Sequence, residues 1–234
     1  MSTPSLRTRV RHEMIDDIKS AARRRLAIDG PDLALRAVAR DLGIVPSALY
    51  RYFGSRDALL TALITDAYDE LGAAAEAAEA EAERADLRGR WMAVCHAVRT
   101  WALTNPSEYT LLYGTPVPGY TAPPDTTPPA SRVVIALIDI LNDAAATGAL
   151  AATPPRDPPV GLRADLAQLV EQAPGGAPDS RASDRVMLAG LAAWTQLFGL
   201  ISFEVFGRLD EMFAHRAEHF DHQMHAMADA AGIP

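Results

Sequence analysis

Residues 35–53 read Leu-Arg-Ala-Val-Ala-Arg-Asp-Leu-Gly-Ile-Val-Pro-Ser-Ala-Leu-Tyr-Arg-Tyr-Phe, and this stretch decides the fold. Val38 is spaced to face a core, and Ala39 is small where a second helix would cross and bring the two axes together. Gly43 can adopt the positive φ that a tight turn between two helices needs. Pro46 suits the first position of the next helix, where no backbone donor is required. The stretch therefore predicts a helix-turn-helix.

The same geometry gives the second helix an inner and an outer face. Leu49 and Phe53 point inward, toward the core. The residues left on the outside are Pro46, Ser47, Ala48, Tyr50, Arg51 and part of Tyr52. A helix with such a face can lie in the major groove of DNA, and Tyr50 and Arg51 are the best candidates for contacts with base edges. The alternative is an ordinary helical hairpin with a glycine turn.

The charge of the chain is unevenly distributed. Residues 1–56 hold 11 Arg and Lys against 6 Asp and Glu, a net charge of +5. Residues 57–234 hold 11 Arg and Lys against 24 Asp and Glu, a net charge of −13. The total charge of −8 therefore combines a basic N-terminal part with an acidic remainder. This asymmetry favours a protein that offers one end to a polyanion, although chance clustering would look the same.

Composition excludes several other classes of protein. Cys95 is the only cysteine, so no disulfide can form within the chain. The first eleven residues are polar and contain arginine, unlike a signal peptide. We find no stretch of eighteen apolar residues without a charge or a proline, and so we expect no membrane contact and a cytoplasmic protein.

Apolar residues recur at helical spacing through most of the chain. Helices are expected near 15–26, 33–53, 57–85, 91–102, 106–112, 133–148, 162–170, 184–206 and 210–230. Residues before 12 are expected to form an arm, and the six prolines within 114–130 argue against a regular helix there. No run of residues alternates as a strand would. The prediction is an all-α fold, with a three-helix DNA-binding domain over residues 12–56 and a larger helical ligand-binding and dimerisation domain over residues 57–234.

The first third of the chain resembles the TetR/AcrR family of bacterial regulators. The resemblance is specific over residues 12–70. It is carried by Leu42-Gly43, by Ser47-Ala48-Leu49-Tyr50-Arg51-Tyr52-Phe53 and by Ser55-Arg56-Asp57-Ala58-Leu59-Leu60. Further along, Leu111-Leu112-Tyr113-Gly114 and Leu197-Phe198-Gly199 are similar to the WHG-type subgroup of C-terminal domains, a match that names no ligand.

The resemblance implies roles for individual residues of the DNA-binding domain. Arg36 falls where the family contacts a phosphate or a groove edge. Tyr52 stands where the family usually has His, and its hydroxyl can still donate to a phosphate. Arg56 matches the Lys or Arg at the start of the fourth helix, which also contacts phosphate. Ala34 departs from the usual Ser or Thr cap, so we expect the second helix to start less firmly.

The resemblance also implies a ligand pocket among the helices of the C-terminal domain. The residues expected to line it are Trp91, Cys95, Trp101, Tyr109, Tyr113 and Leu137. These positions are mostly apolar, so a small lipophilic or aromatic effector is expected. The alternative is that the tryptophans are simply core residues.

One surface of the penultimate helix favours a homodimer. The residues expected at the interface are Leu191, Ala192, Thr195, Phe198, Gly199, Ser202 and Phe206. The small residues in this set allow helices to approach closely, and a two-fold dimer supplies two heads for a palindromic operator. The last helix carries His215, His219, His222 and His225, which a metal or a proton could use, but we expect a solvated face and no metal or cofactor.

Together these patterns predict a sequence-specific regulator of transcription that binds double-stranded operator DNA. Repression relieved by an effector is the family's usual mode. Two alternatives stay open, namely a DNA-binding scaffold without an effector and an all-helical enzyme. Nothing in the sequence supports the enzyme, because adjacent Cys95 and His96 would point about 100° apart on a helix and no other nucleophile–base pair is visible.

Overall fold

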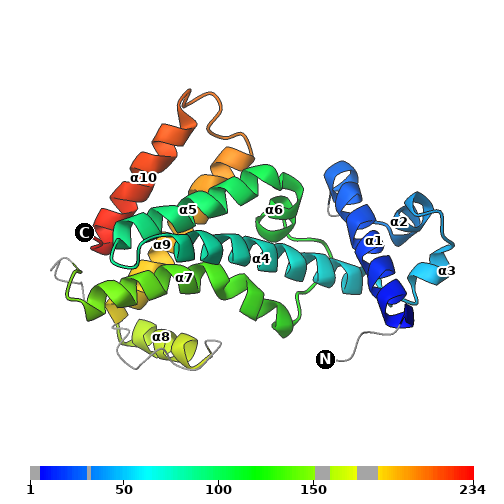
Figure 1. Ribbon diagram of the computed structural model, residues 1–234, viewed down its shortest axis with the longest axis horizontal. Coiled ribbons are helices and arrows are strands. Elements are labelled where there is room, and N and C mark those ends of the chain that lie inside the picture. The colour runs from blue at the N-terminus through cyan, green and yellow to red at the C-terminus, as the bar shows by residue number, and fades with distance from the viewer. Residues whose placement is uncertain (1–5, 31–32, 151–158, 173–183) are drawn as a thin grey trace. The chain divides into compact units, whose positions relative to one another are not determined.

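The computed structural model describes residues 6–30, 33–150, 159–172 and 184–234, and within these ranges it contains helices and turns but no strand (Figure 1). The prediction of an all-α fold is confirmed. The elements in chain order are α1 (Leu6–Asp29), α2 (Leu35–Asp41), α3 (Pro46–Leu49), α4 (Arg56–Glu81), α5 (Leu87–Thr104), α6 (Pro106–Tyr113), the 3-10 helix η1 (Pro124–Thr126), α7 (Thr127–Ala146), α8 (Val160–Gln172), α9 (Asp184–Val205) and α10 (Arg216–Ala231).

Three expected boundaries differ from the structure. The last helix, α10, begins at Arg216 rather than near residue 210. The other two differ for local reasons. The arm expected before residue 12 is helical, because α1 already begins at Leu6. The helix α7 begins at Thr127 and so includes Pro128 and Pro129, which were expected to lie in an irregular segment. Both prolines occupy the first turn of α7, where the backbone N–H groups have no partner within the helix and a proline costs little.

The contacts divide the chain into two compact units. The N-terminal unit comprises Met1–Asp69 together with Asn105–Thr127, and the C-terminal unit comprises Glu70–Thr104 together with Pro128–Pro234. The packing boundary therefore falls inside α4, and a second segment of chain belongs to the N-terminal unit. The functional division after residue 56 stays a prediction.

The core of the N-terminal unit forms where α1 meets α2, α3 and the first half of α4. Ile18, Ala21, Ala22 and Leu26 recur at helical spacing, and all four are buried on one side of α1. The buried residues packed with them are Leu33, Leu35, Val38, Ala39, Leu49, Phe53, Leu59, Leu60, Leu63 and Val117. Helix α6 also packs against α1. This core holds the predicted helix-turn-helix on a rigid base.

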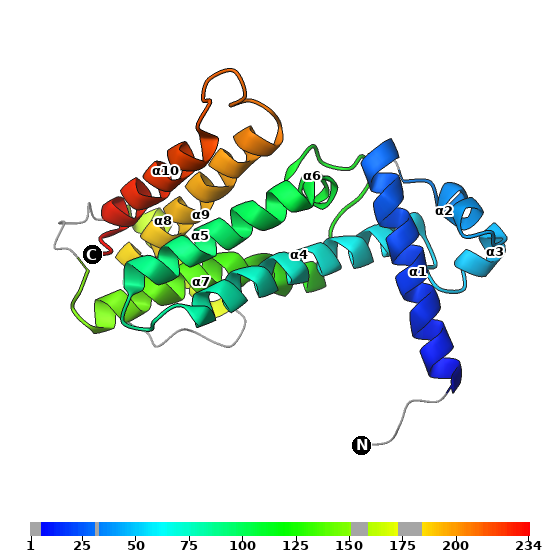
Figure 2. The same cartoon turned by 45° about the horizontal axis from the view of Figure 1, so that its top comes forward.

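The C-terminal unit is a layered bundle in which α9 packs against α5, α8 and α10 (Figure 2). Two glycines allow close helix approaches. A Cβ atom on Gly72 of α4 would overlap the Arg132 side chain of α7, and a Cβ on Gly190 of α9 would overlap Ile138 of α7. Small residues at these crossings therefore fix the distances of α4 and α9 from α7.

Helix α9 corrects the expectation that no stretch could span a membrane. By length and composition it is long and apolar enough, with a mean hydropathy of 1.7 over its best window. One such helix is weak evidence, because a core helix of a soluble protein passes the same test. Part of the apolar character of α9 is used inside the C-terminal unit, where Val186, Ala193, Leu197 and Ile201 are buried.

Candidate DNA-binding surface

The turn between α2 and α3 is closed by backbone hydrogen bonds. The N–H of Ile44 donates to the carbonyl of Ala39 at 3.0 Å, and the N–H of Gly43 donates to the carbonyl of Arg40 at 3.1 Å. This pair of bonds is the Schellman pattern, which needs a left-handed residue after the helix. Gly43 supplies it with φ +66°, as the sequence predicted.

The starts of the two short helices also follow the sequence. Ala34 precedes α2 with an extended backbone and makes no side-chain capping bond, so the first N–H groups of α2 lack the usual cap. Pro46 lies at the start of α3, where a missing N–H costs nothing. Packing compensates for the weak start of α2, since Leu35 and Val38 are buried.

We call residues 46–53 the recognition segment. Its α-helical part ends at Leu49, earlier than expected, and the chain continues as a tighter turn. The N–H of Tyr52 donates to the carbonyl of Leu49 at 2.9 Å, a three-residue spacing, while the N–H of Phe53 donates to the same carbonyl at 3.1 Å. Leu49 and Phe53 point inward as predicted.

The outer face of the recognition segment carries the predicted DNA-binding residues. Pro46, Ser47, Tyr50 and Arg51 are exposed, and Ala48 and Tyr52 are half-buried. Half of the Tyr50 surface is open to solvent, so the ring is free to contact a molecule outside the chain. An exposed aromatic beside a serine and an arginine can contact base edges and thymine methyl groups.

Two further arginines predicted to contact DNA differ in their surroundings. Arg36 is exposed on α2. Arg56 is half-buried, and its Nε donates to the carbonyl of Leu33 at 3.1 Å. Arg56 therefore also ties the start of α4 to the segment before α2, and Ser55 caps α4 by accepting from the N–H of Ala58 at 3.0 Å. The fixed Nε holds the guanidinium of Arg56 at the edge of the helix-turn-helix.

Sequence reasoning missed the polar contacts that set α1 against its neighbours. Arg25 makes a two-point pair with Asp41 of α2, with both distances 2.5 Å, and the pair holds the pKa of Asp41 below its ordinary value. Lys19 pairs with Asp66 of α4 at 2.8 Å. These partners lie far apart along the chain, so no local pattern could have revealed them.

Sequence reasoning also missed a hollow of about 530 Å³ at the edge of the recognition segment. Its lining comes from the first turns of α1 and from two residues of the segment, namely Leu6, Arg7, Val10, Arg11, Arg51 and Tyr52. The arginines before residue 12 carried no expectation, because that part of the chain was expected to be an arm.

The six residues predicted to line a ligand pocket belong to both units. Tyr109 and Tyr113 lie in the N-terminal unit, with ring centroids 5.0 Å apart, and Tyr68 meets Tyr113 edge-on at 6.1 Å. The other four, Trp91, Cys95, Trp101 and Leu137, are buried in the C-terminal unit. A pocket built from all six stays a prediction.

Trp91 has one property that sequence could not show. Its side chain is fully buried, and its Nε1–H has no acceptor among the residues that the structure describes. Buried indole N–H groups usually find a partner, and one left unpaired costs about 1–3 kcal/mol. Trp91 is thus both a core residue and a buried donor.

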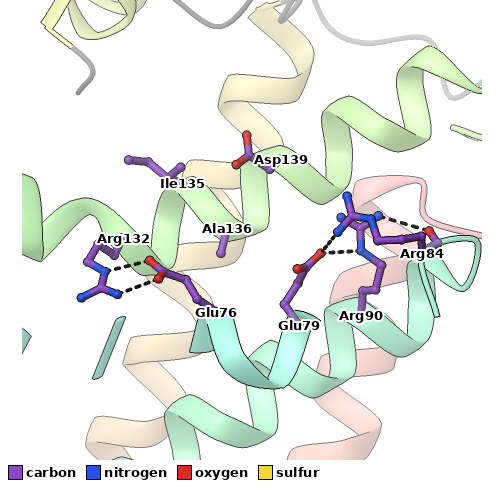
Figure 3. A pocket seen from close by; sticks show the side chains of 8 residues that line it. All are labelled: Glu76, Glu79, Arg84, Arg90, Arg132, Ile135, Ala136 and Asp139. Carbon is purple, nitrogen blue, oxygen red and sulfur yellow. Dashed lines mark hydrogen bonds and ion pairs between the residues drawn. The ribbon is translucent and has the colours of Figure 1, made fainter. Parts of the chain in front are cut away.

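A polar hollow of about 280 Å³ lies among α4, α5 and α7 (Figure 3). Arg132 of α7 donates twice to Glu76 of α4, at 2.7 and 2.6 Å, and this lowers the pKa of Glu76. On the other side Arg90, which is 1% exposed, donates to Glu79 at 2.6 Å.

Charged pairs therefore line most of this hollow, and none of the residues predicted for the ligand pocket lines it. The remaining carboxyl is Asp139, whose pKa is raised by partial burial and by the nearby carboxyls of Asp143 and Glu79. The hollow does not have the apolar walls expected for a lipophilic ligand.

The face of α9 predicted to form a dimer interface is largely open within one protomer. Ala192, Thr195, Gly199 and Phe206 are exposed, and Leu191 and Ser202 are half-buried. A Cβ on Gly199 would meet no atom of the described residues within 4 Å. Phe198 is the exception, because only 6% of it is exposed, and this burial removes it from the open face.

The histidines of α10 and its preceding loop do not converge. His219 stacks on Phe213 with ring centroids 3.9 Å apart, and His215 lies near Glu218. Among the described residues, no three His, Cys, Asp or Glu side chains are placed to share a metal ion. His222 and His225 are simply exposed on α10.

A helix-turn-helix with an exposed Ser, Tyr and Arg face, held on the basic end of the chain, defines the class of helix-turn-helix DNA-binding regulators. Comparison with known proteins agrees with this class. Residues 18–63 match the bacterial regulatory proteins of the tetR family, and residues 91–227 match the tetracyclin repressor-like C-terminal domain. The chain therefore belongs to the TetR family, and it is a DNA-binding transcriptional regulator.

Individual relatives support the same family. HTH-type transcriptional regulator Rv1816 of Mycobacterium tuberculosis is 40% identical over 200 residues, which cover 85% of this chain and 83% of that protein. HTH-type transcriptional regulator Mb1846 of Mycobacterium bovis gives the same figures. The solved structure of regulatory protein SCO4313 has a TM-score of 0.76 and 32% identity, covering 96% of this chain and 98% of its own. A protein of unknown function from Rhodococcus sp. RHA1, at 24% identity and a TM-score of 0.69 over 93% of this chain and 95% of its own, shares the fold.

Proposed function

We propose that the protein is a cytoplasmic, homodimeric repressor that reads an operator through its recognition segment and leaves it when a small molecule binds. The observation that carries the first part is the exposed pair of Ser47 and Tyr50 on the outer face of the recognition segment, held on a rigid core. Base edges in the major groove are read by side chains of this kind, while phosphates only position the protein. The experiment is a selection of random duplexes by the full chain, which is expected to enrich one palindromic sequence.

A matched substitution tests whether Tyr50 reads bases. Tyr50→Ala is expected to relax the preference at one position of each half-site, at a cost of about 1–3 kcal/mol on the selected duplex. The control is Tyr68→Ala, which removes an aromatic side chain of the same unit away from the recognition segment. A loss of equal size on selected and random duplexes would reassign Tyr50 to the DNA backbone.

The homodimer is proposed on the exposed face of α9. Ala192, Thr195 and Gly199 are small and open, so a second copy of α9 could approach closely, and a two-fold dimer would present two recognition segments about 34–36 Å apart along DNA. Gly199→Leu is expected to yield a monomer in light scattering. Because a Cβ atom at this position meets no described atom within 4 Å and the glycine is exposed, folding should be kept.

Ala145→Leu, an equivalent enlargement at an exposed position of α7, is the control for Gly199→Leu. It should leave the dimer intact. If Gly199→Leu stayed dimeric and bound the selected duplex as tightly as the wild type, α9 would not be the interface.

The proposed effector has an apolar body and one hydrogen-bond acceptor. Trp91 supports this, since its buried indole N–H has no acceptor among the described residues and the neighbouring positions Val94 and Val98 of α5 are buried and apolar. An acceptor on the effector would regain the lost hydrogen bond. Helix α4 supports a route to DNA, because it begins at Arg56 beside the recognition segment and continues to Glu81 in the other unit.

Effector binding is tested by screening neutral lipophilic ketones, esters and lactones for stabilisation of the dimer and release of the selected duplex. By thermodynamic linkage, a compound that lowers the affinity of the protein for DNA by some factor must itself bind more weakly, by the same factor, when DNA is present. Trp91→Phe is expected to weaken a true effector about fivefold, the value of one hydrogen bond. If no compound both stabilised the dimer and released DNA, the alternative of a DNA-binding scaffold without an effector would be favoured.

We infer that the protein has no catalytic role. Cys95, the one cysteine of the sequence, is buried, and burial raises the pKa of its thiol, which disfavours the reactive thiolate. His96 lies on the partly exposed side of α5, and its Nε2 is 3.3 Å from a carboxylate oxygen of Asp221 of α10. Incubation with ester and lactone substrates is expected to give no turnover.

A further inference from the structure

The N-terminal unit carries a second cationic feature beside the recognition segment, the hollow of about 530 Å³ between α1 and residues 51–52. Three of its six lining residues are arginines, and none is acidic. Leu6 and Val10 form its apolar wall and are 68% and 50% exposed. A surface of this composition is suited to an anionic ligand with a nonpolar part.

The helix of α1 places its arginines selectively. Arg7 and Arg11 are four residues apart and so share one face, which lines the hollow. Arg9 points about 160° away from that face, since each residue turns the helix by 100°. The guanidinium of Arg11 lies over the ring of Tyr52, 5.4 Å from its centroid, and this cation–π contact joins the first turns of α1 to the recognition segment.

The charges of the arginines of the hollow are not neutralised within the part of the chain that the structure describes. Among the described residues, Arg7, Arg11 and Arg51 pair with no carboxylate, whereas Arg25 on the same helix is fixed by Asp41. All three are exposed. Three guanidinium groups around one hollow, none of them paired with a carboxylate in the part of the chain that the structure describes, favour a ligand that brings its own negative charge.

We propose that this hollow receives the phosphodiester backbone of the DNA duplex next to the bases that the recognition segment reads. Guanidinium groups bind phosphate oxygens through two parallel N–H donors, and Leu6 and Val10 can pack against the adjoining sugar. Arg51 and Tyr52 belong to the recognition segment, so a strand that enters its groove also passes this hollow. The inference rests on the proposed reading of DNA by that segment and extends the contact to α1.

This arrangement assigns Arg51 to the backbone rather than to base edges. It leaves Tyr50 and Ser47 as the base readers. The contact is independent of sequence, and it requires the duplex to extend past the bases that are read. Both properties can be measured.

The test compares Arg7→Gln/Arg11→Gln with Arg9→Gln/Arg24→Gln in the full chain. Each double variant removes two exposed charges from α1, but only the first changes the hollow. If Arg7→Gln/Arg11→Gln removes one phosphate contact from each DNA-binding unit of a dimer, the slope of log affinity against log salt concentration falls in magnitude by about 1.8. The loss of affinity is then about 12-fold greater at 50 mM than at 200 mM salt. The control pair is expected to give a much smaller change.

A second arm varies the DNA. Removing three base pairs from each end of the selected duplex should weaken the wild type and leave Arg7→Gln/Arg11→Gln almost unchanged. The loss of DNA affinity caused by Arg7→Gln/Arg11→Gln should be the same on the selected duplex as on a random duplex of the same length. Circular dichroism and thermal unfolding of each variant confirm that folding is kept.

The outcomes separate this inference from the function on which it rests. If the wild type bound no duplex better than competing polyanions, the proposed function itself would fail. If the wild type bound DNA but both double variants had equal salt slopes, only the hollow would be excluded. Competition by inorganic phosphate at millimolar concentration, without any dependence on duplex length, would identify a site for a free anion and overturn the backbone contact.

Discussion

The pair of Arg99 and Glu204 offers a direct test of how α5 holds α9. Arg99 donates from Nε and Nη2 to the two carboxylate oxygens of Glu204 at 2.7 and 2.6 Å. Only 17% of the Arg99 side chain and 7% of the Glu204 side chain are exposed. Arg99 also lies over the ring of Phe220 of α10, 5.1 Å from its centroid, so one guanidinium links α5 to both α9 and α10.

Arg99→Ala leaves a carboxylate buried without its partner. Removing one member of a buried pair costs about 3–5 kcal/mol, because the remaining charge is poorly solvated. For a chain of this length each kcal/mol lowers the melting temperature by about 2–4 °C, so a fall of about 6–20 °C is expected. The same loss should loosen α9 and lower dimer affinity if α9 is the interface.

The control is Arg84→Ala, because Arg84 also forms ion pairs, with Glu79 and Asp143, but its side chain is 65% exposed. Exposed pairs contribute at most about 1 kcal/mol, so its effect should be small. The double variant Arg99→Met/Glu204→Met should recover most of the stability, since replacing both partners removes the buried charge. Equal melting temperatures for Arg99→Ala and Arg84→Ala in thermal unfolding would refute the reasoning.

Three further predictions concern single positions. Arg56→Ala should reduce the slope of log DNA affinity against log salt concentration by about 0.9 for each DNA-binding unit. It should also lower stability, because the carbonyl of Leu33 loses its donor. An unchanged slope in anisotropy titrations would remove Arg56 from the interface. Ala34→Ser should add the missing cap to α2 and stabilise the protein by about 1 kcal/mol, and a urea midpoint that stays constant would contradict this. Asp139→Asn should raise stability at pH 7, because folding raises the pKa of this carboxyl and so disfavours its ionised form. The gain in stability should shrink as the pH falls through the raised pKa of Asp139, and it should vanish below the ordinary pKa, where the carboxyl is protonated in both the folded and the unfolded protein. A gain of equal size at pH 4 and pH 7 would contradict this prediction.

The parts of the DNA-binding unit that could be predicted depend on local geometry. Gly43 has the positive φ that a turn of this length requires, and Pro46 begins α3 where a proline is tolerated. Val38 and Ala39 are buried because helical spacing already placed them on one face. Each of these properties is set within a few residues, so a single sequence contains enough information.

The parts that could not be predicted depend on residues distant in the chain. The pair of Arg25 and Asp41 joins two helices whose approach is set by the core and not by either sequence segment. Trp91 was expected to line a pocket, but whether its N–H meets an acceptor depends on how neighbouring helices pack. The helical start of α1 at Leu6 was missed because its first turns are polar and largely exposed, so no apolar periodicity marks them.

The N-terminal unit is built from two separate stretches of sequence, and this limits how regulators with this fold can exchange domains by recombination. Residues 105–127 belong to that unit, and within them Val117 enters its core while the hydroxyl of Tyr120 hydrogen-bonds to Thr61 at 2.9 Å. A single recombination crossover at residue 69 would combine residues 1–69 of one regulator with residues 105–127 of another. Mismatched packing at Val117 would then cost stability in each hybrid. Productive recombination, in nature or by design, must carry both segments together.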